Sequence, residues 1–233
     1  MNIRHLIHWM SRQSELFHAL SLPGALRLGM AGLDLEPASS QWPDVRSWRV
    51  STRRHLVRER LARDPKLHVQ LGRAATTRLL ESTDLSRYRT LGVYSPMRGE
   101  IDIGEVAAHH LARGGALALP VVVEKSSPVE FWRWSPGVPM TRGLWNIAIP
   151  AQRERVWPDA LIVPLLGFDA GLYRLGYGGG YYDRTLAQSV PRPYCIGFGL
   201  QAGLLSTIYP QKHDIPMNRI VTDEHLYPEP TAS

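Results

Sequence analysis

The sequence predicts an α/β domain in which helices are layered on a mainly parallel sheet. Short apolar runs at residues 160–168 and 194–199 have the length of buried strands. Such runs alternate along the chain with segments whose apolar residues have helical spacing. This order is typical of a parallel sheet. Hydrophobic residues make up 44% of the 233 residues, enough for one sizeable core. We therefore expect one domain over residues 43–233, preceded by an N-terminal extension over residues 1–42.

The extension is expected to have no catalytic role. Residues 3–20 carry apolar side chains at spacings that indicate a short amphipathic helix. A linker rich in Pro, Gly and Ser follows over residues 22–40, and Met30 within it is a candidate alternative start.

The first half of the domain is expected to begin with two helices. Residues 46–63 are Arg-rich and favour a helix, and residues 66–81 carry apolar residues near helical spacing. A strand follows at residues 90–94. Asp102 and Glu105 have the spacing of a capping box, with Asp102 as the N-cap of the next helix.

The second half of the domain is expected to consist of strands around one glycine-rich loop. Residues 135–149 are rich in Pro and Gly and predict a loop, and residues 171–180 form the glycine-rich loop itself. A helix is predicted directly after it, over residues 181–188. The strands are predicted at residues 116–123, 129–134, 160–168, 194–199 and 220–222.

Composition excludes several classes of protein. The one cysteine, Cys195, excludes an internal disulfide framework and a multi-cysteine zinc site, so a reducing, cytoplasmic location is expected. No segment reaches the ~20 apolar residues that a membrane-spanning helix requires. The net charge is +6, and 24 of the 27 basic residues are Arg. This usage fits a GC-rich genome, phosphate or carboxylate binding, or nucleic-acid binding, and composition alone leaves all three open.

The most informative segment is the loop that joins a predicted strand to the helix over residues 181–188. Four glycines occupy five positions, at 176 and 178–180. Such a run lets backbone N–H groups converge on an anion, and the N-terminus of the following helix adds partial positive charge. Arg174 could add a bidentate contact to the same phosphate. The loop lacks the Lys-Ser/Thr of a P-loop and the strict dinucleotide fingerprint.

The segment Arg174-Leu-Gly-Tyr-Gly-Gly-Gly-Tyr-Tyr-Asp183 closely resembles the signature of the 5-formyltetrahydrofolate cyclo-ligases. Supporting similarities lie at residues 97–102, 145–147, 163–169 and 213–216. The resemblance extends over residues 46–225 in consistent order. It implies an α/β/α three-layer domain with a ligand cleft at the carboxyl edge of a mainly parallel sheet.

The resemblance also implies a reaction and its partners. Family members use ATP and Mg²⁺ to convert 5-formyltetrahydrofolate, in some cases polyglutamylated, into 5,10-methenyltetrahydrofolate, ADP and phosphate. Such chemistry requires positioning and charge neutralisation rather than a nucleophile–base pair. A monomer is expected, with no membrane and no nucleic acid among the partners.

The resemblance assigns roles to individual residues. In the family a Lys and an Arg four residues apart grip the ATP phosphates, and the matching positions here are Arg54 and Arg58, so that Arg replaces Lys. The remaining ATP contacts are expected from Arg174, Gly176, Gly178, Gly179, Gly180, Tyr181 and Tyr182. The folate contacts are expected from Met97, Glu100, Trp145, Tyr177, Tyr181 and Tyr182. The Mg²⁺ ligands are expected to be Asp183 and Asp214.

Two other functions remain open at this stage. A folate- or nucleotide-binding protein without turnover fits the same fold. The feature that favours this function is Arg54, which stands where the family has Lys. A nucleic-acid-binding protein fits the pI of about 9.7, but the chain has no RNA-binding signature and its charge is spread along the sequence.

Overall fold

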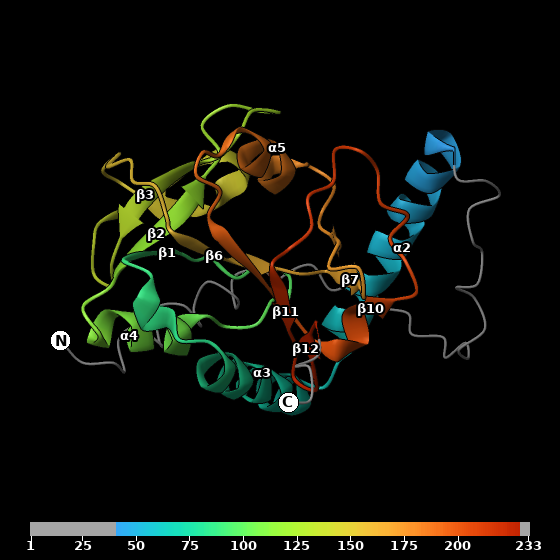
Figure 1. Cartoon of the computed structure of the whole chain (residues 1–233), viewed down its shortest axis with the longest axis horizontal. Coiled ribbons are helices and arrows are strands. Elements are labelled where there is room, and N and C mark those ends of the chain that lie inside the picture. Colours follow the sequence, from blue (N-terminus) through green and yellow to red (C-terminus); the bar gives the residue numbers. More distant parts are fainter. Residues whose placement is uncertain (1–40, 229–233) are drawn as a thin grey trace.

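The computed structural model describes residues 41–228, so the predicted helix at 3–20 and the linker at 22–40 lie outside the described residues (Figure 1). The first described helix is α2 (Trp42–Ala62), followed by α3 (Pro65–Ser82). These confirm the two predicted helices. Proline stands in the first turn of each, where its missing N–H costs nothing. The carboxylate of Asp64 caps α3 by accepting the N–H of Leu67 at 2.9 Å.

The central sheet has seven strands, in the order β12-β11-β9-β6-β1-β2-β3. The five inner strands run parallel, and the two edge strands, β12 and β3, pair antiparallel. The prediction of a mainly parallel sheet is therefore confirmed. The strands are β1 (Thr90–Gly92), β2 (Ala116–Val121), β3 (Glu130–Trp134), β6 (Ala160–Pro164), β9 (Tyr194–Phe198), β11 (Arg219–Val221) and β12 (Leu226–Tyr227).

Helices cover both faces of this sheet, which gives the three layers (Figure 1). Along β6, Ile162 packs into the core beneath α3 and α4 (Gly104–Ala112), whereas its neighbour Leu161 packs into the core beneath α5 (Tyr181–Gln188). This alternation is the normal consequence of strand geometry, because successive side chains point to opposite faces. Cys195 of β9 is buried in the second core, and burial raises the pKa of its thiol to about 11.

A second sheet of three short strands lies beside α2, in the order β10-β7-β8 (Figure 1). It consists of β7 (Gly167–Asp169), β8 (Arg174–Leu175) and β10 (Leu204–Leu205). The predicted continuous strand over 160–168 is therefore wrong, because the chain leaves the central sheet after Pro164 and joins the second sheet at Gly167. A Cβ atom at Gly167 would lie 2.8 Å from Cδ1 of Leu56, so this glycine permits the close approach of α2.

Two further expectations need correction. The predicted loop over 135–149 contains a hairpin of β4 (Met140–Arg142) and β5 (Ala148–Pro150), joined through a 3₁₀ turn at Leu144–Asn146. The helix α4 begins one residue later than the capping box predicts, with Ile103 as its N-cap. The carboxylate of Asp102 still accepts the N–H of Gly104, at 2.6 Å. None of the helices within residues 41–228 combines the length and apolarity needed to cross a bilayer.

Candidate active site at the carboxyl edge of the sheet

The glycine loop connects β8 to α5 and depends on glycine for its shape. Gly178 has φ +93° and Gly180 has φ +64°, in the left-handed region that side chains disfavour. A Cβ atom at Gly179 would lie 2.6 Å from the ring of Tyr181. The predicted boundary between loop and helix is confirmed, since α5 begins at Tyr181 with Gly180 as its N-cap. The first-turn N–H groups of α5 therefore follow directly on the glycines.

Two arginines contact the segment that holds this loop. Arg53 of α2 donates from Nε to the carbonyl of Gly176 at 2.7 Å. Burial and the neighbouring Arg49 guanidinium lower the pKa of Arg53 from its usual value. Arg174 is only 6% exposed in its side chain, and its Nη1 donates to the carbonyl of Ile215 at 2.9 Å. Two guanidinium groups thus lie beside the loop, and that of Arg174 is ion-paired with Asp183 at 2.9 Å.

The structure does not bring Arg54 and Arg58 to the loop. Both side chains are exposed, and that of Arg58 is 72% exposed and lies 3.9 Å from Glu59. The inward face of α2 carries Arg49 and Arg53 instead, which have the same four-residue spacing. The predicted phosphate-binding pair, Arg54 and Arg58, therefore does not lie on the face of α2 that points toward the loop.

Val45, which is buried, could have identified the inward face of α2. Positions four and eight residues after Val45 lie on the same helix face, and these are Arg49 and Arg53. The helix predicted over residues 46–63 did not include Val45. Because arginines occur all around this helix, their spacing alone could not identify the inward face.

The two predicted metal ligands, Asp183 and Asp214, differ in their surroundings. Asp183 lies in the first turn of α5, and its Oδ1 accepts the N–H of Ile215 at 3.0 Å and pairs with Nη2 of Arg174 at 2.9 Å. Among the described residues these contacts all involve Oδ1, and the side chain is 19% exposed. One carboxylate oxygen of Asp183 can therefore face a cation.

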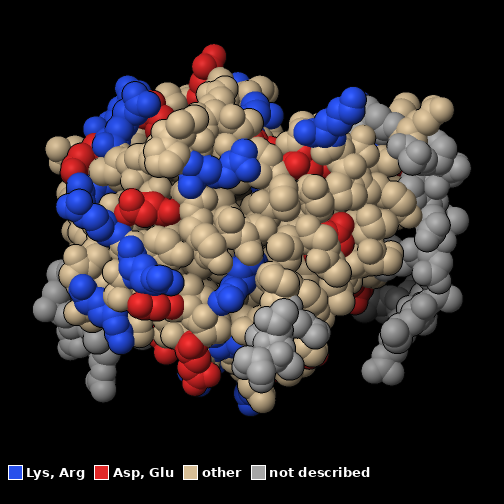
Figure 2. Space-filling view, viewed as in Figure 1, with Lys and Arg blue, Asp and Glu red and all other residues tan. Residues whose placement is uncertain are grey.

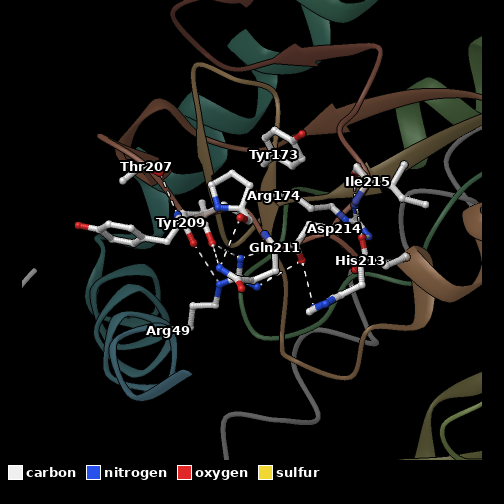
Figure 3. A network of polar contacts seen from close by, with 12 residues as sticks. Arg49, Tyr173, Arg174, Thr207, Tyr209, Gln211, His213, Asp214 and Ile215 are labelled. Carbon is white, nitrogen blue, oxygen red and sulfur yellow. Dashed lines mark hydrogen bonds and ion pairs between the residues drawn. The ribbon is translucent and has the colours of Figure 1, made fainter. Parts of the chain in front are cut away.

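Asp214 is held on both oxygens by protein groups (Figure 3). Its Oδ2 lies 2.5 Å from Nη2 of Arg49 and 2.7 Å from the N–H of Gln211, and its Oδ1 accepts from Nη1 of Arg49 at 3.3 Å. Burial raises the pKa of Asp214, but the hydrogen bonds from Arg49 and Gln211 outweigh it, and the pKa lies below its usual value. Arg49 also donates to the carbonyls of Ile208 and Tyr209, at 3.0 and 2.9 Å. Asp214 therefore joins α2 to the segment that follows β10.

Within residues 41–228, no group of three or more His, Cys, Asp or Glu side chains is arranged to hold a metal ion. A cation at this site would thus depend on fewer than three such side chains and on oxygens from a ligand, which is the usual way that proteins hold Mg²⁺ with a nucleotide.

Glu100 lies in the loop that follows β1, and its carboxylate is partly buried. Oε2 accepts the N–H of Met97 at 2.9 Å, and the hydroxyl of Tyr177 donates to the same carboxylate. Burial raises the pKa of Glu100 to about 7, against the opposing effects of Arg60 and the Met97 N–H. A carboxylate with so little water around it prefers a ligand that brings N–H donors.

The pocket at Glu100 lies at the carboxyl ends of three neighbouring parallel strands, β1, β6 and β9. Its lining comes from the segments that follow β1, β6 and β9, together with Arg60 of α2. This is the edge at which open α/β sheets bind ligands. The lining residues are Arg60, Gly99, Glu100, Ile101, Leu165, Phe198, Gly199 and Leu200.

Aromatic side chains surround the glycine loop. Trp145 is 53% exposed, has φ +56°, and meets Tyr181 edge to face with ring centroids 5.6 Å apart. The guanidinium of Arg184 lies 5.1 Å from the Tyr181 ring centroid, and that of Arg98 lies 5.5 Å from the Tyr177 ring centroid. An exposed tryptophan held in a strained backbone conformation offers an aromatic face to a planar ligand.

The remaining predicted contacts lie around the same loop. Tyr182 packs under Arg174, whose guanidinium is 5.7 Å from the ring centroid. Burial and the nearby Glu100 raise the pKa of Tyr182 above its usual value. Met97 is partly buried beside Glu100. Apart from Arg54 and Arg58, the predicted residues therefore lie on the segments that border this edge of the sheet.

The comparisons with known proteins agree with this geometry. The model of the 5-formyltetrahydrofolate cyclo-ligase family matches residues 45–223. The chain belongs to this family. One relative is the 5-formyltetrahydrofolate cyclo-ligase of Escherichia coli K12, which is 28% identical over 180 residues that cover 74% of this chain and 99% of that protein. The cyclo-ligase of Mycolicibacterium smegmatis is 28% identical over 148 residues, covering 58% of this chain and 73% of that protein.

Two solved structures share the fold of this cyclo-ligase family member. The NMR structure of Aquifex aeolicus 5,10-methenyltetrahydrofolate synthetase has a TM-score of 0.68 at 24% identity, and covers 79% of this chain and 95% of that chain. The structure of the Mycoplasma pneumoniae 5,10-methenyltetrahydrofolate synthetase has a TM-score of 0.62 at 20% identity, and covers 76% of this chain and 99% of that chain. The predicted α/β/α fold is confirmed.

The charge on the face drawn in Figure 2 does not favour the nucleic-acid alternative. On the face in Figure 2, Lys and Arg side chains are interleaved with Asp and Glu. Among the described residues, Glu130 pairs with Arg153 at 2.6 Å and with Arg155 at 3.5 Å. Nucleic-acid binding requires basic side chains that are free to contact phosphates.

Proposed function

We propose that the chain catalyses the ATP- and Mg²⁺-dependent cyclisation of 5-formyltetrahydrofolate to 5,10-methenyltetrahydrofolate, with release of ADP and phosphate. The observation that carries this proposal is the convergence of an anion-binding glycine loop and a partly buried carboxylate, that of Glu100, at one edge of the sheet. Tyr177 belongs to the loop and hydrogen-bonds Glu100, so the two halves of the site are in contact. Membership of the family supports the same reaction.

The phosphates of ATP would bind at the glycine loop. Backbone N–H groups of the glycines at 176 and 178–180, which carry no side chains, and the N-terminus of α5 supply hydrogen-bond donors. Arg53 and Arg174 add positive charge from either side of the loop. If Arg49 and Arg53 are the four-residue pair of the family, Arg53 takes the place of the family's Arg, and Arg49 stands where the family has Lys.

Asp183 fits the role of Mg²⁺ ligand, and Asp214 does not. The outer oxygen of Asp183 is available, whereas both oxygens of Asp214 are engaged by Arg49 and by the N–H of Gln211. Magnesium at Asp183 would neutralise charge on the ATP phosphates. We therefore assign Asp214 to holding the segment after β10 against α2.

The folate would bind with its pterin ring toward Glu100. The pterin edge carries two adjacent N–H donors, which a carboxylate can accept in place of the Tyr177 hydroxyl. Trp145 and Tyr181 would pack against the planar rings, and Met97 lies beside the carboxylate. This orientation would bring the formyl group toward the phosphates at the glycine loop.

The chemistry then needs little more than alignment. The formyl oxygen attacks the γ-phosphorus of ATP and displaces ADP, and the neighbouring N10 amine attacks the activated carbon and loses its proton. The carbon–oxygen bond breaks as phosphate leaves, which completes the ring. Arg53 and Arg174 hold the transferred group, and positioning supplies most of the rate.

A spectrophotometric assay tests this proposal. The purified protein is mixed with 5-formyltetrahydrofolate and MgATP, and methenyltetrahydrofolate absorbance is followed against controls without ATP and without Mg²⁺. The proposal requires product that depends on both. Tight folate binding with no product in the complete mixture would instead assign the chain to the non-catalytic binding class.

A further inference from the structure

Arg184 lies at the end of the first turn of α5 and reaches back over the glycine loop. It is the fourth residue of the helix, which begins at Tyr181. Side chains on a helix tilt toward its N-terminus, so a long side chain at this position covers the turn before it. Its Nη2 donates to the carbonyl of Gly179, and its Nη1 lies only 2.9 Å from the place that a Cβ atom at Gly180 would take. The guanidinium therefore rests on the backbone of the loop itself.

The ring of Tyr181 holds this guanidinium in place. The guanidinium carbon of Arg184 lies 5.1 Å from the ring centroid, which is a cation–π contact. The same ring packs on the loop, because a Cβ atom at Gly179 would lie 2.6 Å from it. Trp145 meets the ring edge to face, and the Tyr181 hydroxyl accepts the N–H of Ser126 at 3.4 Å. Arg184 is thus held against the loop by a ring that two other segments fix.

This placement of Arg184 opposes two local preferences. The guanidinium lies at the N-terminus of α5, where the partial positive charge of the helix disfavours a cation. Its Nε atom is buried and has no hydrogen-bond partner among the described residues, which is costly for an N–H group. Residues that break local preferences in this way are expected at functional or strained sites. The costs therefore favour a role for Arg184 in binding rather than in folding.

The hydrogen bond to the Gly179 carbonyl determines where the next N–H group points. A trans peptide is planar, with its C=O and its N–H on opposite sides. The peptide between Gly179 and Gly180 is trans. Because Arg184 holds the carbonyl on its own side, the N–H of Gly180 points to the other side, away from the guanidinium.

Arg53 makes an equivalent contact at the other end of the loop. Its Nε donates to the carbonyl of Gly176 at 2.7 Å. Arg53 and Arg184 therefore hold one carbonyl each, and the N–H that follows each carbonyl points away from the arginine. An anion-binding loop needs this arrangement, because N–H groups attract an anion and carbonyl oxygens repel it. A charged donor on the carbonyl also polarises the peptide, which strengthens its N–H as a donor.

We propose that Arg184 is a positioning residue for the phosphates of ATP. By holding the carbonyl of Gly179, it turns the N–H of Gly180 toward the phosphates, and it lies on the far side of that peptide from them. The inference rests on the proposed function, in which the glycine loop binds ATP.

Titration of MgATP into the full chain without folate, followed by calorimetry, tests this role. Arg184→Ala should weaken ATP binding about tenfold, the effect of losing one charge-assisted hydrogen bond. Arg184→Gln removes the charge with less loss of packing and should show a similar decrease, so the test does not depend on one variant folding. Arg184→Lys keeps a charged donor for the carbonyl and should stay within about threefold of the wild-type affinity.

Chemical rescue separates positioning from a general effect on the fold. Added guanidinium ion should restore part of the ATP affinity of Arg184→Ala, because it can donate to the same carbonyl. Sodium chloride at the same concentration should restore none. A variant whose loop is merely destabilised would gain nothing from either salt.

Arg192→Ala is the matched control, because Arg192 is exposed and lies beyond the other end of α5. It should bind MgATP as the wild-type protein does. Unchanged ATP affinity in Arg184→Ala, or a loss that guanidinium does not restore, would overturn the inference while the loop remains the ATP site. A wild-type protein that binds 5-formyltetrahydrofolate but not MgATP would overturn the proposed function together with the inference.

Discussion

Replacing Glu100 by Gln should change how the stability of the protein depends on pH. Burial raises the pKa of Glu100 to about 7 in the folded chain, from an ordinary value of 4.5. A raised carboxyl pKa means that the folded state holds the proton more tightly than the unfolded state does. The contribution of the Glu100 proton to the free energy of unfolding is therefore present in full below pH 4.5 and is lost as the pH rises through 7.

The size of this effect follows from the two pKa values. Between pH 5.5 and pH 8.5, the wild-type protein should lose about 2 kcal/mol of unfolding free energy through Glu100 alone. Glu100→Gln has no proton to lose and keeps the shape of the side chain, so it should lack this component. Urea unfolding of both proteins at both pH values gives the difference, and other titrating groups cancel because the two proteins share them.

The same replacement should weaken folate binding, because a neutral amide accepts the pterin N–H donors less strongly than a carboxylate. The variant is thus expected to be more stable than the wild-type protein at pH 8.5 and poorer in folate affinity. Parallel pH dependences of unfolding, within about 0.5 kcal/mol, would refute the reasoning that places a poorly hydrated carboxylate at this position.

Three further replacements test the rest of the site. Arg53→Ala should raise the KM for ATP about tenfold or more, whereas Arg54→Ala should leave it within about twofold, and equal effects would contradict the helix register. Asp183→Asn should lower kcat at least about tenfold at limiting Mg²⁺ while circular dichroism stays unchanged, and wild-type turnover there would exclude its role. Arg49→Leu should cost about 3–5 kcal/mol of unfolding free energy, because it leaves Asp214 buried without its partner, and a loss below about 1 kcal/mol would show that the pair is dispensable.

Local signals were sufficient for much of this fold. The glycines before residue 181 and the amphipathic pattern after them locate the start of α5 correctly, since both the turn and the helix are encoded within a few residues. The inner strands of the sheet were also found from their apolar runs. By contrast, the apolar run over 160–168 conceals the change of sheet after Pro164, because both of its strands are buried.

Long-range partners could not be read from the sequence. Asp214 pairs with Arg49, which lies 165 positions earlier in the chain, and nothing in its local context distinguishes an ion-paired aspartate from a metal ligand. The choice between Arg53 and Arg54 likewise depends on which face of α2 is buried, and that face is determined by packing against the second sheet. Both questions depend on tertiary contacts rather than on residue types.

The most direct test of the proposed reaction is the fate of the formyl oxygen. The full chain is incubated with MgATP and with 5-formyltetrahydrofolate carrying ¹⁸O in its formyl group, and the inorganic phosphate is analysed by mass spectrometry. If the glycine loop and the Glu100 pocket bring the γ-phosphate and the formyl group together, each methenyltetrahydrofolate formed should be accompanied by one phosphate that carries a single ¹⁸O. Product accompanied by unlabelled phosphate would contradict this account of the site.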